Sequence, residues 1–301
     1  MAGKDWTAED IPDLTGKIAV VTGASSGLGA ETARVLGARG ARVIMGVRDL
    51  DKGERVVAAI RARHPDAQVE VQRLDLASLA LTKRFAQGTR TRLTRLDLLI
   101  ANAAEMVPPG QREEPRTQDG FELQFGTNHL GHFALIGHLL PLLEATRDAR
   151  IVVVGSQAYR RARLDLEDLN WRDRAYRPAR AYRDSKIANL HFTAELVRRL
   201  GRTGPRVTVA LPGLAVTGLQ RHAAGPRMLA RALGQGTGAA AAPILRAAFD
   251  PAARPGEWFA PDGLLGLRGA PVAVTPAARA DDPETAKRLW NRSEALTGVT
   301  Y

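Results

Sequence analysis

Thr22-Gly-Ala-Ser-Ser-Gly-Leu-Gly29 is the stretch that decides the fold, because it joins an apolar run to a helical pattern. Residues 18–22 have the β-branched composition of a buried strand, and residues 30–39 have the spacing of an amphipathic helix. Glycines let the backbone turn tightly and approach a ligand without a Cβ clash. The N-terminus of the next helix offers N–H groups to a pyrophosphate. We therefore expect cofactor contacts along this turn, from Gly23, Ser25, Ser26, Gly27, Leu28 and Gly29.

Outward from this turn, strand and helix patterns alternate along the chain. We predict further strands at residues 42–46, 69–74, 96–101, 150–155, 206–211 and 257–260, and helices at 51–63, 78–90, 118–145, 180–200 and 238–249. Such alternation implies right-handed crossovers and a parallel sheet that is covered on both faces. The predicted fold class is α/β: a doubly wound Rossmann sheet with helices on both faces, in a single domain over residues 1–301.

A competing interpretation of the turn is the nucleophile elbow of an α/β-hydrolase. Gly23-Ala-Ser-Ser-Gly27 matches the pattern G-x-S-x-G, which also connects a strand to a helix. That fold needs earlier strands and an oxyanion loop upstream, whereas only about 20 residues precede the turn. The elbow also leaves Gly29 unexplained, so we favour the dinucleotide.

Composition limits the class of protein. The net charge is +11, but only 5% of residues are aromatic, which leaves little for stacking on nucleic-acid bases. A positive field that attracts an anionic cofactor explains the charge better. The absence of cysteine excludes disulfides and thiolate catalysis. No apolar run reaches the roughly 18 residues that span a bilayer, and the N-terminal residues are polar, so we expect a cytoplasmic protein without a membrane anchor.

Several further motifs follow the turn in order. They are Leu74-Asp75-Leu76, Ala101-Asn-Ala-Ala104, Asn128-His-Leu-Gly-His-Phe133, Val153-Val-Gly-Ser156, Tyr182-Arg-Asp-Ser-Lys186 and Pro212-Gly-Leu-Ala-Val-Thr217. Together they resemble the short-chain dehydrogenase/reductase family over nearly the whole chain. The 128–133 motif, the long loop between Ser156 and Tyr182, and Leu289-Trp290 resemble the retinol dehydrogenase-like group. Ala101, Ala104 and Gly155 depart from the usual family residues without removing a reacting group.

The resemblance implies hydride transfer between a nicotinamide dinucleotide and a carbonyl or alcohol, with Tyr182 as general acid/base. Lys186 lies four residues later, on the same helix face. An ammonium about 4 Å from the phenol, at an effective dielectric of about 20, stabilises phenolate by about 4 kcal/mol, so we expect a lowered pKa for Tyr182. By resemblance, Ser156 bonds the substrate oxygen, and Asn128 bends its helix and holds a water that links Lys186 to solvent.

The resemblance also distributes the remaining cofactor contacts. Asp75 and Leu76 are expected beside the adenine, and Asn102 with Ala103 on the adenosine side of the cleft. The nicotinamide is expected beside Pro212, Gly213 and Thr217. Thr217 is also compatible with a simple turn or helix cap.

The end of the second strand indicates which dinucleotide is used. Val47 stands where an acid would bind the ribose hydroxyl of NAD, and Arg48 follows it. Because arginine binds phosphate in a bidentate manner, we predict NADP(H) in preference to NAD(H), with Asp49 pointing outward. His129 and His132 lie three residues apart without acidic neighbours, so we expect packed residues and no metal site.

The segments expected to cover a small-molecule substrate are residues 107–116, 157–181 and 214–235. They mix apolar side chains with arginines, which indicates an apolar ketone or aldehyde of moderate size. The apolar faces of residues 133–143 and 187–196 suggest pairing in a homo-oligomer. A non-catalytic NADP(H)-binding sensor stays open as an alternative, since it would use the same cofactor residues.

Overall fold

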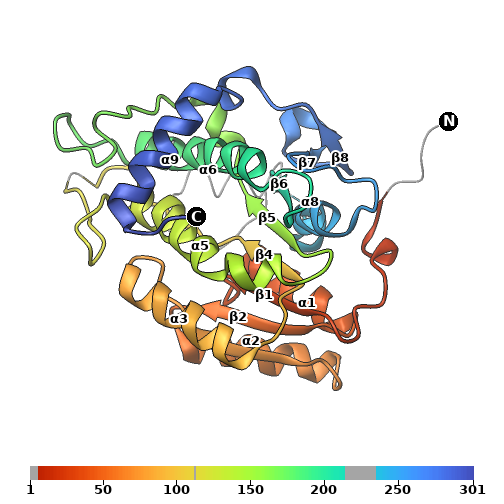
Figure 1. The fold of residues 1–301 in the computed structure, drawn as a ribbon. Coiled ribbons are helices and arrows are strands. Elements are labelled where there is room, and N and C mark those ends of the chain that lie inside the picture. Colours follow the sequence, from red (N-terminus) through yellow and green to blue (C-terminus); the bar gives the residue numbers. More distant parts are fainter. Residues whose placement is uncertain (1–5, 112, 214–234) are drawn as a thin grey trace.

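A computed structural model describes residues 6–111, 113–213 and 235–301 (Figure 1). In this part of the chain, eight strands form one sheet in the order β3-β2-β1-β4-β5-β6-β7-β8. All neighbours are parallel except β7 and β8, which are antiparallel. The strands are β1 Ile18–Thr22, β2 Arg42–Val47, β3 Val69–Arg73, β4 Leu98–Ala101, β5 Arg150–Val154, β6 Arg206–Ala210, β7 Trp258–Pro261 and β8 Pro271–Val274.

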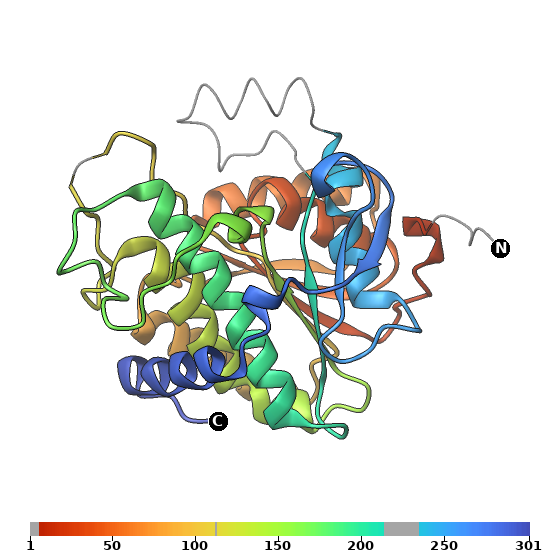
Figure 2. The ribbon, with the colours of Figure 1, turned by 90° about the horizontal axis from the view of Figure 1, so that it is seen from above.

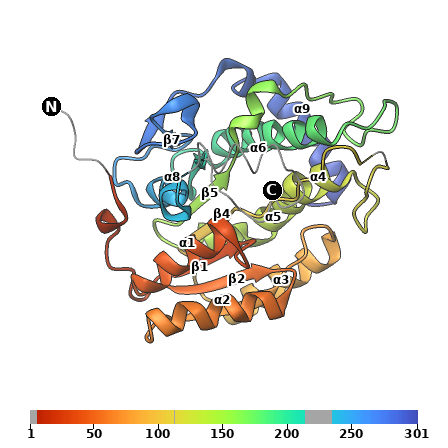
Figure 3. The ribbon, with the colours of Figure 1, turned by 180° about the vertical axis from the view of Figure 1, so that it is seen from behind.

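Helices cover both faces of this sheet, because successive strand residues point to opposite sides. In β1, Val21 belongs to the core on one face and Val20 to the core on the other. Figures 1 and 3 show the two helical layers from opposite sides. One layer holds α1 Gly27–Ala38, α2 Leu50–Arg63 and α8 Thr237–Phe249; the other holds α3 Leu79–Arg92, α5 Gly131–Glu144 and α6 Pro178–Leu200.

This topology confirms the predicted doubly wound fold. The chain starts the sheet at β1, runs outward to β3, and then returns to β4 on the other side of β1. At such a reversal the loops after neighbouring strands diverge and leave a crevice for a ligand. No strand in the described part of the chain precedes β1, so the upstream strands that a hydrolase elbow requires are missing there.

The predicted helix over residues 118–145 is wrong at its start. Gly120 has a φ of +83°, and Arg116 forms a β-bridge with Glu122, so this stretch is a tight turn. The helix begins only at α4, Leu123–Phe125, where the Glu122 carboxylate accepts a hydrogen bond from the Phe125 N–H at 2.6 Å. A π-helical turn over Gly126–Leu130 follows and leads into α5. Asn128 lies at the centre of that turn.

Two elements that follow the predicted strand at residues 257–260 were not predicted, although the Leu289-Trp290 motif lies in the second of them. Strand β8 extends the sheet, and α9, Pro283–Thr297, packs across α6 (Figure 2). Trp290 stacks on Phe192 and meets Phe133 edge to face, while the Tyr301 hydroxyl donates to the Phe133 carbonyl at 2.6 Å. We expected the faces that carry Phe133 and Phe192 to pair between subunits, but these aromatic side chains pack against α9 and Tyr301 of the same chain. Oligomerisation stays a prediction.

No helix among the described residues combines the length and the apolar character needed to cross a bilayer.

Two buried histidines connect the helices on the α5 side of the sheet. His129 contacts Asn189 of α6 and Ser293 of α9, at 3.3 and 2.8 Å. His132 contacts the Asn128 carbonyl and the Thr22 hydroxyl, each at 2.9 Å. Burial lowers the pKa of His129 to about 3 and that of His132 to about 4. Both are therefore neutral, packed residues, as their lack of acidic neighbours indicated.

Because the pKa values of these two histidines are lowered in the folded protein, we predict that the protein loses stability in mild acid. Below the ordinary histidine pKa of 6.5, both side chains become protonated in the unfolded chain, but in the folded protein they stay neutral down to about pH 4. The free energy of unfolding should therefore fall by about 1.4 kcal/mol per pH unit for each histidine in that window. Chemical denaturation between about pH 7 and pH 5 measures it.

A His129→Gln variant isolates the effect. The variant should be less stable than the parent near pH 7, because it breaks the contacts to α6 and α9, but it should lose less stability on acidification. Equal losses in both proteins would contradict the assignment.

Candidate functional site

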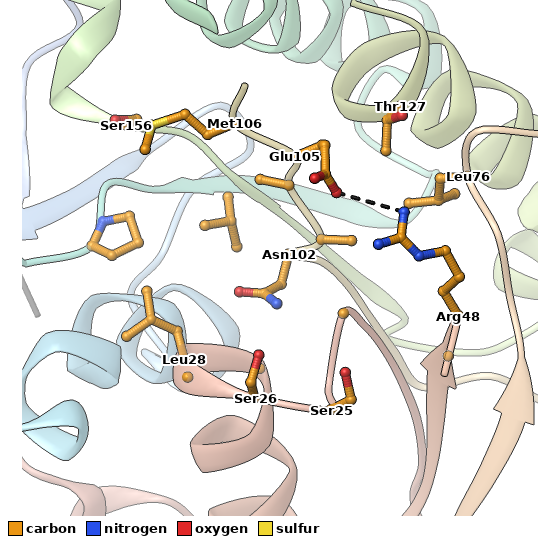
Figure 4. Close-up of a pocket in the computed structure, with 18 of the residues that line it drawn as sticks. Ser25, Ser26, Leu28, Arg48, Leu76, Asn102, Glu105, Met106, Thr127 and Ser156 are labelled. Atoms are coloured by element: carbon orange, nitrogen blue, oxygen red, sulfur yellow. Dashed lines mark ion pairs between the residues drawn. The ribbon is translucent and has the colours of Figure 1, made fainter. Parts of the chain in front are cut away.

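A cavity of about 570 Å³ opens at the carboxyl ends of the central strands (Figure 4). It collects almost all of the residues predicted for the site from their separate places in the sequence. Those that line it are Gly23, Ser25, Ser26, Gly27, Leu28, Gly29, Arg48, Asp75, Leu76, Asn102, Ala103, Ser156, Tyr182, Lys186, Pro212 and Gly213.

The glycine turn lies so close to the end of β4 that a side chain would not fit at Gly23 or at Gly29. A Cβ on Gly23, whose φ is +67°, would lie 2.7 Å from the Ala103 Cα. A Cβ on Gly29 would lie 2.6 Å from the Gly23 carbonyl oxygen and 2.5 Å from the Asn102 Nδ2. Such a turn, followed by the N-terminus of α1, fits the pyrophosphate of a dinucleotide.

Thr22 joins this turn to the neighbouring strand. Its hydroxyl oxygen accepts hydrogen bonds from the backbone N–H groups of Asn102 and Ala103, both at 2.9 Å. The Asn102 side chain donates to the Thr22 carbonyl at 2.8 Å. Asn102 therefore fixes the floor of the cavity by tying β4 to β1.

His132 connects the same threonine to the helix that carries Asn128. The Asn128 carbonyl can only accept, so the Nδ1 of His132 must donate to it. In a neutral imidazole the Nε2 is then an acceptor, and the Thr22 hydroxyl donates to it. This imidazole therefore links the glycine turn to the π-helical turn.

Asn128 does not line the cavity but lies completely buried behind it. Its Oδ1 accepts from the Glu105 N–H at 2.7 Å, and its Nδ2 donates to the Glu105 carbonyl at 2.9 Å and to the Ser185 hydroxyl at 3.0 Å. Its own carbonyl accepts from His132 and from Asn189. These bonds position the segment after β4 and the helix α6. The water path to Lys186 stays a prediction.

Ser156, Tyr182 and Lys186 meet at the other end of the cavity. Ser156 follows β5 and hydrogen-bonds the side chain of Tyr182 on α6. The Lys186 ammonium lies 5.8 Å from the centre of the Tyr182 ring and donates to the Val154 carbonyl at 3.4 Å. The cluster thus places a hydroxyl, a phenol and an amine around one point of the cavity wall.

Burial changes the pKa values in this cluster. We expected a lowered pKa for Tyr182, but the protein by itself raises it. Burial raises the pKa of Tyr182 because it penalises the phenolate, and the hydrogen bond with Ser156 offsets only part of that effect. Burial also lowers the pKa of Lys186 to about 8, because the ammonium is desolvated. Tyr182 is therefore a neutral phenol near pH 7.

Arg48 lies at the opposite end of the cavity, directly after β2. Its guanidinium is paired with the Glu105 carboxylate at 3.7 Å (Figure 4). Asp49 borders the cavity rather than pointing away, but its carboxylate caps α2 by accepting from the Lys52 N–H at 2.9 Å. Asp75 likewise accepts from the Ala77 N–H at 3.0 Å. Glu105 is thus the carboxylate engaged with Arg48.

Thr127 is a buried polar residue at this end of the cavity. It lines the cavity, and within the described chain its buried hydroxyl has no hydrogen-bond partner (Figure 4). A buried hydroxyl without a partner costs stability unless something else satisfies it. A polar group of a ligand bound beside Arg48 would do so.

The sequence did not single out several other lining residues. Glu105 and Met106 directly follow the Ala101–Ala104 motif, so their position was a usable signal. Leu267 comes from the connection between β7 and β8, for which no motif exists. Thr217, and with it residues 214–234, lies outside the described residues. Within the described ranges no three metal-binding side chains gather.

Comparisons with known proteins agree with this geometry. A family model described as short chain dehydrogenase matches residues 17–167. Human retinol dehydrogenase 13 is 38% identical over 297 residues, covering 95% of this chain and 86% of that protein. An uncharacterized protein from Mycobacterium paratuberculosis aligns with a TM-score of 0.81 at 43% identity, over 99% of both chains. The active-site complex of Pseudomonas aeruginosa RhlG with NADP aligns with a TM-score of 0.57 at 28% identity, over 71% of this chain and 78% of that one.

Adding one methyl group at the glycine turn should abolish tight cofactor binding. In Gly29→Ala the new Cβ would collide with the backbone of Gly23, so the turn must shift, at a cost of about 1–3 kcal/mol. The Kd for NADPH, measured by fluorescence titration, should rise about tenfold or more.

Gly88→Ala, in the middle of α3, is the matched control. Its Cβ would meet only the Gln72 side chain at 3.4 Å, and alanine favours a helix interior by about 0.5–1 kcal/mol. This variant should bind NADPH as the parent does. Unchanged affinity in Gly29→Ala would refute the assignment of the turn.

Proposed function

The chain belongs to the short-chain dehydrogenase/reductase family, and on that premise we propose an NADP(H)-dependent oxidoreductase that interconverts a carbonyl compound and an alcohol. The observation that carries the proposal is the convergence of Ser156, Tyr182 and Lys186 on one end of a cavity that the glycine turn also lines. A bound dinucleotide supplies the hydride, and the chain supplies the proton. We treat residues 1–301 as one catalytic domain.

Tyr182 is the proton donor in the direction of reduction. Its raised pKa keeps the phenol protonated near neutral pH, and a neutral phenol can give its proton to the substrate oxygen as that oxygen gains charge. Ser156 hydrogen-bonds the phenol. In this proposal it also donates to the same substrate oxygen. In the direction of oxidation, Tyr182 takes the proton back from the alcohol.

Lys186 stabilises the phenolate that this proton transfer leaves behind. With a pKa of about 8 it is still mostly charged at pH 7, and it lies in a buried site where charge acts strongly. Asn128 acts through position, because it holds both the Glu105 backbone at the cofactor side and Ser185 on the helix of Tyr182.

Arg48 supports NADP(H) as the preferred dinucleotide. It follows β2, where a guanidinium can bind a 2′-phosphate, and no acid occupies the preceding position. The relative RhlG was solved with NADP, which fits this choice.

The substrate we propose is an apolar ketone or aldehyde of moderate size, with the alcohol as its partner. Met106, which lies beside Ser156 in Figure 4, and Leu267 give the cavity wall apolar surface. The similar proteins named retinol dehydrogenases point the same way, because retinol is a largely apolar alcohol. Residues 157–181 and 214–235 are proposed to cover this substrate.

Tyr182→Phe tests the chemistry. Removing the phenol oxygen should lower kcat/KM by about 10²–10⁴-fold, the usual contribution of a general acid, while NADPH still binds. The assay is NADPH oxidation against a panel containing retinal, apolar ketones and hydrophilic sugars.

Tyr301→Phe makes the same chemical change far from the cavity and serves as control. It loses only the bond to the Phe133 carbonyl, at a cost of about 0.5–1.5 kcal/mol in stability. It should keep the parent's turnover. Binding of NADPH without turnover on any carbonyl would contradict an enzyme and favour a sensor.

Arg48→Gln tests the choice of dinucleotide. Loss of the guanidinium should raise KM for NADPH by about tenfold or more, the effect of losing a charge-assisted phosphate contact, and leave KM for NADH within about twofold. Steady-state kinetics with both nucleotides measures it. A parent enzyme that clearly prefers NADH would overturn the assignment.

A further inference from the structure

The Arg48–Glu105 ion pair is the feature of the cavity that the proposed chemistry does not explain. The two side chains come from different strands: Arg48 follows β2 and Glu105 comes four residues after β4. Their charged groups approach to 3.7 Å across the adenosine end (Figure 4). Both remain accessible, with 63% of the arginine side chain and 36% of the glutamate side chain exposed, so a ligand can reach either.

Glu105 is held in this place by its backbone. Its N–H donates to the Asn128 Oδ1 at 2.7 Å, and its carbonyl accepts from the Asn128 Nδ2 at 2.9 Å. Asn128 is itself buried and fully bonded. These two backbone bonds keep Glu105 beside Arg48, and its side chain lines the cavity.

The other acids of this end are engaged elsewhere. The Asp49 carboxylate caps α2, and the Asp75 carboxylate caps the turn at Ala77. A phosphate that binds Arg48 would thus meet Glu105 as the carboxylate already bound to the same guanidinium. Two anions at one cation repel each other, and the repulsion is strongest at low ionic strength.

We propose that Glu105 is a cofactor-specificity residue, which competes with the 2′-phosphate of NADP(H) for Arg48 and so narrows the preference over NAD(H). The inference rests on the proposed function, because it requires a dinucleotide at this site. For NAD(H) the effect has the opposite sign, since a carboxylate here can accept a hydrogen bond from the ribose 2′-hydroxyl.

Glu105→Gln tests the proposal, because it removes the charge and nearly keeps the shape. The Kd for NADPH and for its fragment 2′,5′-ADP should fall about tenfold at low salt. The Kd for NADH and 5′-AMP should rise by about twofold, because the hydrogen bond with the ribose hydroxyl is weakened. Raising the salt to about 0.5 M should shrink the gain, since screening already weakens the repulsion in the parent.

Glu70→Gln is the matched control. Glu70 has the same side-chain exposure of 36% and also pairs with arginine, to Arg42 at 2.9 Å, but it lies outside the cavity. The variant changes the net charge equally and should leave all four affinities unchanged. An equal gain in Glu70→Gln would overturn the proposal, because net charge alone would then explain the effect.

The remaining outcomes separate this inference from the proposed function. If Glu105→Gln binds NADPH no better than the parent while Arg48→Gln binds it worse, Arg48 binds the 2′-phosphate but Glu105 does not compete with it, and the inference is refuted. If Glu105→Gln binds NADPH worse, the carboxylate orients Arg48 instead, and the competition is again refuted. If the parent binds neither NADPH nor 2′,5′-ADP, both the inference and the NADP(H) assignment fall.

Discussion

The hydrogen bonds at Thr22 are the constraint on which the rest of the site depends. One hydroxyl accepts from two backbone groups of the segment after β4 and donates to His132. Because Thr22 and His132 are buried, a bond lost between them would leave a polar atom without water. The glycine turn, the floor of the cavity and the helix of Asn128 are thereby held in one geometry, with Gly23 and Gly29 small enough to permit it.

Asn128 connects the Thr22–His132 pair to both ends of the cavity. The backbone carbonyl of Asn128 accepts a hydrogen bond from His132. The side chain of Asn128 bonds the Glu105 backbone on one side and the Ser185 hydroxyl on the other. Ser185 is on the helix of Tyr182, and Glu105 reaches Arg48. One buried asparagine therefore fixes the spacing between the residues proposed for proton transfer and those proposed for the ribose phosphate.

Burial sets the acid–base properties of the reacting end. The same desolvation that keeps Tyr182 protonated also weakens the hold of Lys186 on its proton. Both groups are thus shifted toward their neutral forms. On the far side, α9 and Tyr301 seal the aromatic face of α5 and α6, so the helices that carry Asn128 and Tyr182 pack against their own chain.

The sequence by itself determined the doubly wound fold, the glycine turn and most residues of the cavity, because these follow from local periodicity and from short motifs. Several features required the tertiary structure: the turn at Gly120, the strand β8, the pairing of Arg48 with Glu105 and the raised pKa of Tyr182. The ion pair joins groups far apart in the chain, and the pKa shift comes from burial that packing alone creates. A spacing of four residues placed Tyr182 and Lys186 on one helix face, but only their desolvation decided which forms they take.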